Sequence, residues 1–512
     1  MEILNSIKTI FIVEKIALRP NGIHLSIIKK MELMEERWGY KSLMLVTEHS
    51  PHLSSAIANR LDKSNVISVY EYLQQVDRTN KKTAEPPKNP GEKRKVLKNN
   101  VHSIFNDSGM VRNEHYYTNG TLAGLDYYEN GSKIRTDLYD DYGNISSSKF
   151  YDTFDNNYHP VEEYYRPDGK LCIKVEYKPI PTDILGKTHE ITKLSLYDNN
   201  GSVTETFASN AELAAYCLAK ILEEHKDKVC LLVVEDPMYV KTALLQKQKN
   251  VIKTCLIHSA FLQNPYELSG ETQYFYTQLC SHANEFDALV FLTETEREDF
   301  IKLYGNVAKT FTIAHMYAKD ISKVAFEERD TKKAVIVSRF DPVKRIEVAI
   351  DIFRRVVEEV PDAELEIYGA GKEEDKYKQH IKKLGLEDNV FIKGYTEEAA
   401  TVFSEAVLSM ATSYIEGFML TVMESICNGC PVFSLDIKYG PSDIIANNKT
   451  GFIFARDDKI TFAKKLVAYF NDTALQRKMS ENAYSDAWRF SPETFLENWF
   501  AFMETMYYDV IK

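Results

Sequence analysis

The start of the chain alternates between short apolar runs and apolar residues at helical spacing. Strand-like runs cover residues 7–13 and 41–46, and a helical pattern covers residues 23–37 between them. Strands separated by helices are typical of a parallel sheet with crossover connections. The chain is therefore predicted to begin with an α/β domain, whose pattern stops near residue 100 and returns near residue 210.

The same alternation fills the chain beyond residue 210. It predicts strands at 229–235, 253–257 and 288–292 and helices at 211–224 and 294–304. Beyond residue 318 it predicts strands at 334–338, 364–368, 390–394, 408–411 and 431–434. The first helix of this part has one apolar face, formed by Ile346, Ala349, Ile350, Phe353, Val356, Val357 and Val360. Helices between strands indicate a second parallel sheet.

Residues 101–207 follow a different pattern, rich in tyrosine and β-branched side chains. Turn pairs end in Gly120, Gly131, Gly143, Gly169 and Gly201, and most carry Asn or Asp before the glycine. Such pairs favour the positive-φ turns that join antiparallel strands. We predict an antiparallel β-meander inserted into the first α/β domain. Its open edges must be covered or paired, so self-association through the insert is our hypothesis.

These patterns predict an α/β fold in which two Rossmann-like domains face a cleft. The first domain comprises residues 1–100 and 208–318, and the inserted meander occupies 101–207. The second domain comprises 319–489, and a helix at about 490–512 is expected to pack back on the first domain. Open α/β sheets bind ligands beyond the carboxyl ends of their strands. Polar side chains that follow predicted strands are therefore the candidates for chemistry.

Composition narrows the class of protein. With 512 residues, 44% of them hydrophobic, the chain is long enough for two or three compact domains. A formal net charge of −12 argues against a nucleic-acid-binding protein. Seven cysteines are too few for a disulfide framework, so a cytoplasmic location is expected. Cys427 and Cys430 form a C-x-x-C, but no second Cys or His pair lies nearby, so no metal site is predicted.

One stretch of the acidic chain is strongly basic. Glu85 and Glu92 are its only acids, and its cations are Lys81, Lys82, Lys88, Lys93, Arg94, Lys95 and Lys98. We call residues 81–98 the basic strip. Its charge and its prolines fit either a solvated linker or a mobile segment for an anionic acceptor or a membrane surface, and both interpretations stay open.

Two loops after predicted strands suit a nucleotide. Arg339 and Lys344 follow the strand at 334–338, and a guanidinium with an ammonium is a natural pair for a diphosphate. A solvated basic turn is the alternative for that loop. The turn at 368–371 contains Gly369 and Gly371 and allows close backbone approach to a base or ribose, although such turns are common in α/β proteins.

The segment from Glu416 to Glu424 is more informative. Residues 417–420 are predicted to open a helix whose amides and dipole suit phosphate oxygens. Glu416 precedes this helix and Glu424 lies within it, so both carboxylates are expected to point toward the ligand. The alternative on spacing alone is two solvated helix carboxylates.

With these motifs the chain resembles the retaining GT-B glycosyltransferases of family four. The resemblance rests on the E-x7-E spacing of Glu416 and Glu424, on Arg339 with Lys344, and on the turn at 429–432. It covers the second domain almost throughout. The inserted meander is similar to a bacterial branch that contains teichoic-acid α-glycosyltransferases and adhesin O-glycosyltransferases. His258 after a strand fits that branch, and so does Gly22 in the 20–23 loop, where many relatives have a second glycine.

The resemblance implies roles for these residues. Arg339, Lys344 and the amides of 417–420 would neutralise the leaving diphosphate, so that neither a metal nor a cofactor is needed. Glu416 would hold the transferred sugar, Glu424 the ribose, and His258 the sugar or phosphate. The implied catalytic residues are Glu416, His258, Arg339 and Lys344. The implied donor-binding residues are Gly22, Ser338, Arg339, Lys344, Tyr368, Gly369, Gly371, Tyr395, Glu416, Gly417, Phe418, Met419, Leu420, Thr421 and Glu424.

The resemblance also implies an activity. The expected reaction moves glucose or N-acetylglucosamine from a UDP-sugar, with α stereochemistry, to a hydroxyl of a polyol-phosphate polymer such as wall teichoic acid. O-glycosylation of Ser or Thr in a surface protein is an alternative, and a non-catalytic homologue that binds a glycan or a partner is another. Expected partners are the UDP-sugar, the anionic polymer or a Ser/Thr-rich protein, a second copy of the chain, and the inner face of the cell membrane, but not nucleic acid.

Overall fold

The computed structural model of the protein describes residues 2–16, 22–58, 60–97, 100–117, 120–152, 158–181, 188–319 and 323–511. Pro20, Asn21, Lys98 and Asn119, which belong to sequence motifs named above, lie outside these ranges. The chain forms two compact units, Met1–Lys253 and Thr254–Lys512. No helix within the described ranges is both long and apolar enough to cross a membrane.

A seven-stranded sheet contains the strands predicted on both sides of the insert. Its order is β17-β16-β15-β14-β1-β2-β3. The strands are β1 (Ile7–Val13), β2 (Leu43–Val46), β3 (Val66–Ser68), β14 (Val229–Val234), β15 (Val251–Ile257), β16 (Ala288–Phe291) and β17 (Lys309–Thr312). β1 pairs in parallel with both β14 and β2. Every residue of β14 is buried, as a parallel strand covered on both faces requires.

The helices of this α/β part include the three that were predicted, at 23–37, 211–224 and 294–304, and shorter ones that were not. They are α1 (Glu2–Ser6), α2 (Gly22–Trp38), α3 (Leu53–Ala56), α4 (Val69–Gln74), α5 (Asn210–Glu224), α6 (Val240–Leu244), α7 (Thr277–Ser281) and α8 (Glu294–Tyr304). Short 3-10 turns lie between them: η1 (Lys63–Asn65), η2 (Pro237–Tyr239), η3 (Tyr274–Tyr276) and η4 (Ala283–Glu285). Ser209 and Thr293 cap α5 and α8, since each side chain accepts a hydrogen bond from an amide of the first turn.

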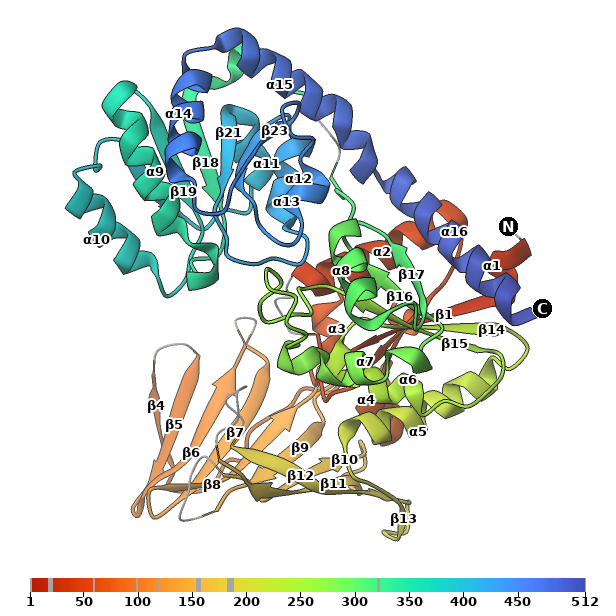
Figure 1. Cartoon of the computed structure of the whole chain (residues 1–512). Helices are drawn as coiled ribbons and strands as arrows, with labels where there is room; N and C mark the ends of the chain where they lie inside the picture. Colours follow the sequence, from red (N-terminus) through yellow and green to blue (C-terminus); the bar gives the residue numbers. More distant parts are fainter. Residues whose placement is uncertain are drawn as a thin grey trace. The chain divides into compact units, whose positions relative to one another are not determined.

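The insert is a ten-stranded antiparallel sheet in sequential order, which confirms the predicted meander (Figure 1). Its strands are β4 (Lys93–Val96), β5 (Val101–Asn106), β6 (Gly109–Tyr116), β7 (Leu122–Glu129), β8 (Ser132–Tyr139), β9 (Ile145–Phe150), β10 (Val161–Tyr165), β11 (Leu171–Pro179), β12 (His189–Tyr197) and β13 (Val203–Phe207). The five predicted turn glycines have φ between 81° and 83°. That conformation is easy for glycine, so the turns form where the sequence placed them.

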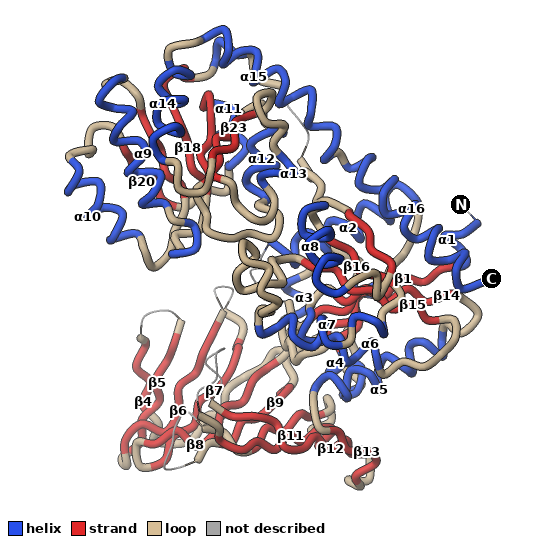
Figure 2. The backbone as a smooth tube through the Cα atoms, in the orientation of Figure 1, coloured by secondary structure: helices blue, strands red, loops and turns tan. Residues whose placement is uncertain are grey.

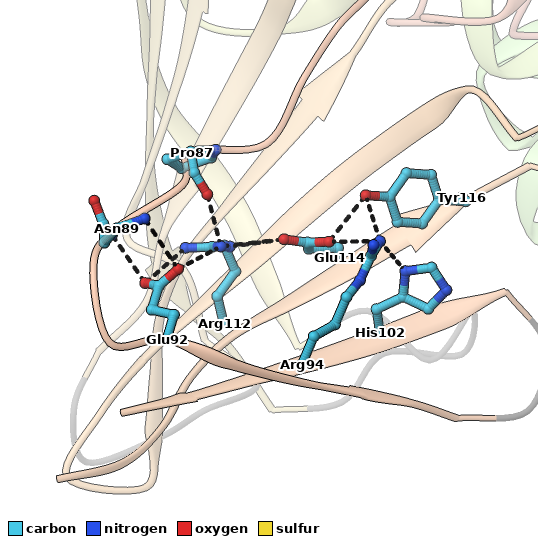
Figure 3. Close-up of polar contacts among 8 residues, drawn as sticks. All are labelled: Pro87, Asn89, Glu92, Arg94, His102, Arg112, Glu114 and Tyr116. Carbon is cyan, nitrogen blue, oxygen red and sulfur yellow. Dashed lines mark hydrogen bonds and ion pairs between the residues drawn. The ribbon is translucent and has the colours of Figure 1, made fainter. Parts of the chain in front are cut away.

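Part of the basic strip forms an edge of this sheet, so that part is not a free linker. Its residues 93–96 form β4, which pairs with β5 and begins upstream of the predicted start of the insert. Behind the strip, the buried Arg112 guanidinium donates to Glu92 Oε2 at 3.0 Å, Glu114 Oε1 at 3.1 Å and the Pro87 carbonyl at 2.8 Å (Figure 3). Arg94 donates to the other oxygen of Glu114 at 3.2 Å.

The third sheet is parallel and six-stranded, with the order β20-β19-β18-β21-β22-β23. Its strands are β18 (Asp330–Val337), β19 (Glu364–Tyr368), β20 (Val390–Gly394), β21 (Ala406–Ala411), β22 (Val432–Leu435) and β23 (Gly451–Phe454). Helices flank it on both faces (Figure 2). They are α9 (Ile346–Glu359), α10 (Glu374–Leu384), α11 (Ala399–Glu405), α12 (Leu420–Cys427), α13 (Pro441–Ile444), α14 (Lys459–Phe470) and α15 (Thr473–Asp486), with η5 (Phe326–Glu328), η6 (Pro342–Lys344) and η7 (Ala487–Phe490).

The core of this part is continuous across the sheet. The predicted apolar face of α9 is buried at Ile346, Ala349, Ile350, Phe353 and Val356. These residues belong to one cluster with Ile336 of β18 and Leu466 of α14. The last helix, α16 (Pro492–Ile511), packs Phe502 edge-on against Phe311 of β17, with ring centroids 4.9 Å apart.

Candidate donor-sugar site

The loop after β18 brings the two predicted opposite charges together. Asp341 caps η6, because its side chain accepts a hydrogen bond from the Val343 amide at 3.1 Å. Lys344 ends η6, and its Nζ donates to Glu416 Oε1 at 2.6 Å. The two side chains are 16% and 12% exposed. A short ion pair with little solvent access is held more firmly than one on an open surface.

Arg339 lies in the same loop and is exposed. Within the described part of the chain, its guanidinium is bound to no other side chain. Arg339 therefore retains its planar set of donors for an anionic ligand.

The glycine turn after β19 supports the β18 loop. A Cβ on Gly369 would lie 1.8 Å from the Ser338 carbonyl oxygen, and one on Gly371 would lie 2.3 Å from the Phe340 oxygen. The amides of Ser338 and Phe340 donate to the Tyr368 and Ala370 carbonyls at 3.0 and 2.9 Å. The glycines are therefore required by the packing of two loops, a reason independent of any nucleotide.

Two tyrosines of the predicted donor set differ in their surroundings. The Tyr368 hydroxyl donates to Glu366 Oε2 at 2.9 Å, and its ring is half-buried. Tyr395, beyond β20, is 74% exposed. Its ring is thus accessible to a ligand, whereas the Tyr368 hydroxyl already has an acceptor.

The segment between Glu416 and α12 departs from the predicted helix start. The helix begins at Leu420, and Met419 before it has φ 71°. The physical reason is Gly417, where a Cβ would lie 2.3 Å from the His258 carbonyl oxygen. The chain passes directly against the His258 backbone at this point and then turns into the helix. Met419 and Thr421 line a small pocket together with Ser338 and Lys344.

Glu424 lies in the second turn of α12 and is half-buried. Burial raises its pKa from 4.5 to about 7, and Lys319 opposes that effect. The carboxyl group therefore changes charge near neutral pH.

His258 follows β15, as predicted, and is joined to the segment 417–418 by a second histidine. The amides of His258 and Ser259 both donate to the Tyr276 hydroxyl at 3.1 Å. The His258 ring stacks on His315 at 5.7 Å, and His315 meets the Phe418 ring at 5.3 Å. Sequence reasoning missed His315. It lies after β17, a strand that the sequence pattern did not predict, so no signal marked it as a residue at a strand end.

The structure thus gathers most of the predicted donor residues within Thr254–Lys512. Gly22 belongs to the other unit, where it is the first residue of α2. Among residues with described placement, no group of three or more His, Cys, Asp or Glu side chains is arranged to hold a metal ion. Cys427 and Cys430 are buried, and burial raises the pKa of their thiols to about 12 and about 11.

Comparison with known proteins relates the chain to a family and to structures of the same fold. Residues 318–486 match the family described as glycosyl transferases group 1. The structure aligns with that of TarM at a TM-score of 0.80 and 20% identity, covering 97% of this chain and 98% of that one. It aligns with the pneumococcal O-GlcNAc transferase GtfA in complex with UDP and GlcNAc at 0.78 and 17% identity, covering 98% and 99%. The chain therefore has the GT-B fold that its pattern of strands and helices predicted, and residues 318–486 match a glycosyltransferase family.

Relatives by sequence narrow the class to a branch. The chain is 27% identical over 382 residues to the poly(glycerol-phosphate) alpha-glucosyltransferase of Bacillus subtilis, covering 70% of this chain and 56% of that relative. It is 29% identical over 355 residues to the poly(ribitol-phosphate) alpha-N-acetylglucosaminyltransferase of Staphylococcus aureus, covering 67% and 69%. The GtfA subunit of the Streptococcus agalactiae peptide N-acetylglucosaminyltransferase is 26% identical, with 59% and 61% covered. These relatives confirm the branch that the insert predicted.

Proposed function

We propose that this protein transfers glucose or N-acetylglucosamine from a UDP-sugar to a hydroxyl of a polyol-phosphate polymer, with α stereochemistry. The observation that carries the proposal is the 2.6 Å contact between Lys344 and Glu416 at the head of α12. This contact brings Lys344, a cation that can bind the diphosphate, next to Glu416, a carboxylate that can bind the sugar. The activities named for the Bacillus and Staphylococcus relatives support the polymer as acceptor.

Negative charge develops on the diphosphate as the glycosidic bond breaks. Arg339 and Lys344 neutralise it, and the first turn of α12 adds backbone dipoles. Glu416 accepts hydrogen bonds from the sugar hydroxyls and stabilises positive charge at the anomeric carbon. His258 binds the sugar or phosphate from the opposite loop, and Glu424 binds the ribose hydroxyls.

The acceptor attacks the face from which the diphosphate leaves, and a phosphate oxygen takes the acceptor's proton. The new bond thereby retains the α configuration. The fixed cations do the work of a metal ion, so neither a metal nor a cofactor is required. Full activity in excess EDTA is expected, and activity restored only by added Mg²⁺ or Mn²⁺ would contradict this point.

The basic strip contacts the acceptor polymer. Lys81, Lys88, Lys93 and Lys95 are all exposed. Lys93 and Lys95 lie on the edge strand β4, whereas the neighbouring Lys82 amide donates to the Tyr142 carbonyl at the β8–β9 turn at 2.8 Å. The Arg112 network holds residues 87–92 against that sheet, so the cations have a fixed backbone beneath them (Figure 3). Exposed cations on a supported backbone suit the repeating phosphates of an anionic chain.

Location and assembly follow from the same features. All seven cysteines are free thiols, in keeping with a cytoplasmic protein at the inner face of the cell membrane, where the basic strip also meets anionic lipid. β13 has one strand neighbour in the ten-stranded sheet, and self-association pairs this edge. A monomeric mass in solution would contradict the self-association.

One experiment separates the candidate functions. The protein is incubated with UDP-glucose or UDP-N-acetylglucosamine and either poly(glycerol phosphate), poly(ribitol phosphate) or a Ser/Thr-rich peptide. Sugar is expected on a polymer. Transfer to the peptide alone would support protein O-glycosylation, the activity named for GtfA. No transfer from either donor would favour a non-catalytic homologue.

A further inference from the structure

Asp299 of α8 is a buried carboxylate that the sequence did not distinguish from its solvated neighbours. It is 2% exposed. Its Oδ2 accepts hydrogen bonds from Lys438 Nζ and, at 3.2 Å, from the Tyr439 hydroxyl. Its Oδ1 accepts one from Lys302 Nζ at 3.1 Å. Both oxygens are therefore satisfied, as a carboxylate removed from water requires.

Lys438 and Tyr439 hold the backbone of Glu416 from both sides. The Glu416 amide donates to the Lys438 carbonyl at 3.0 Å, and the Tyr439 amide donates to the Glu416 carbonyl at 2.7 Å. At the next residue, a Cβ on Gly440 would lie 2.0 Å from the Phe418 carbonyl oxygen. Residues 438–440 thus lie directly along residues 416–418, and displacing one segment displaces the other.

Tyr266 supports the same segment by a different route. Its hydroxyl accepts a hydrogen bond from the Lys438 amide at 3.1 Å and donates to the Tyr414 carbonyl at 2.8 Å. The Arg456 guanidinium lies 3.9 Å from its ring centroid. Tyr266 fixes the backbone of the segment, whereas Asp299 holds the side chains of Lys438 and Tyr439.

We propose that Asp299 is a positioning residue for Glu416, acting through Lys438 and Tyr439. The inference rests on the proposed function, in which Glu416 binds the transferred sugar. Asp299 touches no substrate in this account. Glu416 contacts the sugar and not the nucleotide, so loosening its support weakens sugar recognition and turnover while UDP binding stays intact.

The test uses Asp299→Asn, which keeps the side-chain shape and removes the charge. Turnover is measured with whichever of UDP-glucose and UDP-N-acetylglucosamine the wild type uses, and Kd is measured for UDP and for that UDP-sugar. We expect kcat to fall about tenfold to a hundredfold, as a small misplacement of a reacting group does, with Kd for UDP nearly unchanged. Glu298→Gln is the matched control, because it makes the same change of charge at an exposed neighbour on α8, and wild-type kcat is expected.

Two further variants keep the test decisive. Tyr439→Phe removes only one hydrogen bond to Asp299 and is expected to lower kcat in the same direction but less, so it decides the matter if Asp299→Asn does not fold. In a Glu416→Gln background, Asp299→Asn should leave the ratio of the UDP and UDP-sugar Kd values unchanged, because the residue it positions is already disabled.

Several results would overturn the inference. The inference is wrong if Asp299→Asn keeps the wild-type kcat. If Asp299→Asn does not fold, a wild-type kcat in Tyr439→Phe overturns it instead. It is also wrong if Asp299→Asn loses affinity for UDP and for the UDP-sugar equally. A further change in the ratio of the two Kd values when Asp299→Asn is added to Glu416→Gln would overturn it too. Absence of transfer by the wild type would instead contradict the proposed function, so the two failures are distinguishable.

Discussion

At the scale of single residues, Lys344 is the side chain on which the proposed reaction depends most. Replacing Lys344 with Ala removes the cation proposed to stabilise the departing diphosphate and leaves Glu416 without its 2.6 Å partner. We expect kcat to fall by about a hundredfold or more, the usual effect of losing one transition-state contact. Arg354→Ala is a suitable control, because Arg354 is an exposed cation of α9 that pairs with Glu358. Steady-state kinetics of both variants measures the change in kcat. Wild-type turnover in Lys344→Ala would contradict the proposed role of Lys344.

Glu424 predicts a pH dependence. Its pKa, raised by burial to about 7, makes the neutral acid predominate in acidic buffer and the carboxylate in alkaline buffer. Because the carboxylate accepts both ribose hydroxyls, UDP affinity is expected to rise from about pH 6 to about pH 8. Calorimetric titration with UDP measures this, and Glu424→Gln should show no such rise. A similar rise in Glu424→Gln would assign the effect to another group.

The same group affects stability in the opposite direction. A carboxyl whose pKa is raised on folding favours the folded state while it is protonated. That contribution is complete below the unfolded pKa near 4.5 and is lost as pH rises through about 7. Glu424→Gln should therefore raise the Tm of the ligand-free protein more at pH 8 than at pH 5. An equal change at both values would contradict the raised pKa.

Residue-level prediction from sequence worked where a side chain follows a readable strand. Lys344 and Glu416 were found in that way, and the structure brings them into contact. Asp299 was not found, since within a helix its spacing matches that of a solvated acid. Only tertiary packing, which places Lys438 and Tyr439 beside it, reveals its burial.

At the scale of elements, the start of α12 depends on the absence of a side chain at Gly417. Gly417→Ala would place a methyl group 2.3 Å from the His258 oxygen, so either the loop or the helix start must move. We expect a loss of stability of about 1–3 kcal/mol, as for other overpacked sites, together with a lower kcat. Denaturant unfolding and kinetics measure the two effects.

Gly385→Ala is the matched control for that change. Gly385 ends α10 at φ +64° with open space around it, so its replacement is expected to cost about 1 kcal/mol through backbone strain without changing kcat. Equal kinetic behaviour of the two alanine variants would contradict the close approach at Gly417.

Long elements were easier to predict than short ones. The apolar face of α9 and the strands β19 and β20 were predicted correctly, because their periodicity extends over several residues. β3, β17 and β23 were missed, although the equally short β2, β16 and β22 were predicted. Short strands were recognised where they form a clear apolar run, and β17, with the sequence Lys-Thr-Phe-Thr, does not. The helix start at Leu420 was also missed, because its cause is contact with a distant loop.

At the scale of the whole molecule, the sequence predicted the architecture because each part has its own pattern. Helical spacing between apolar runs indicated the parallel sheets, and glycine turns at regular intervals indicated the inserted sheet. The domain boundaries stay predictions. The basic strip could not be recognised as a sheet edge, since Lys93 to Val96 lacks the alternation of a half-buried strand and all four residues are exposed.

The basic strip supplies a prediction about the acceptor. Changing Lys81, Lys93 and Lys95 together to Glu should raise the KM for the polymer by about tenfold or more and weaken its dependence on salt, because phosphate contacts release counterions. Affinity for UDP should not change. The control changes the exposed Lys226, Lys247 and Lys249 to Glu, which alters the net charge by the same amount. We expect this control variant to keep the wild-type KM, because the proposed contact is local to the basic strip.

The most direct test of the central claim is an assay of sugar transfer from labelled UDP-glucose and UDP-N-acetylglucosamine to purified poly(glycerol phosphate) and poly(ribitol phosphate), with the linkage of the product determined by NMR. The account predicts label on a polymer hydroxyl in the α configuration from the wild type, and almost none from Lys344→Ala. A β-linked product, or no transfer from either donor to either polymer, would contradict it.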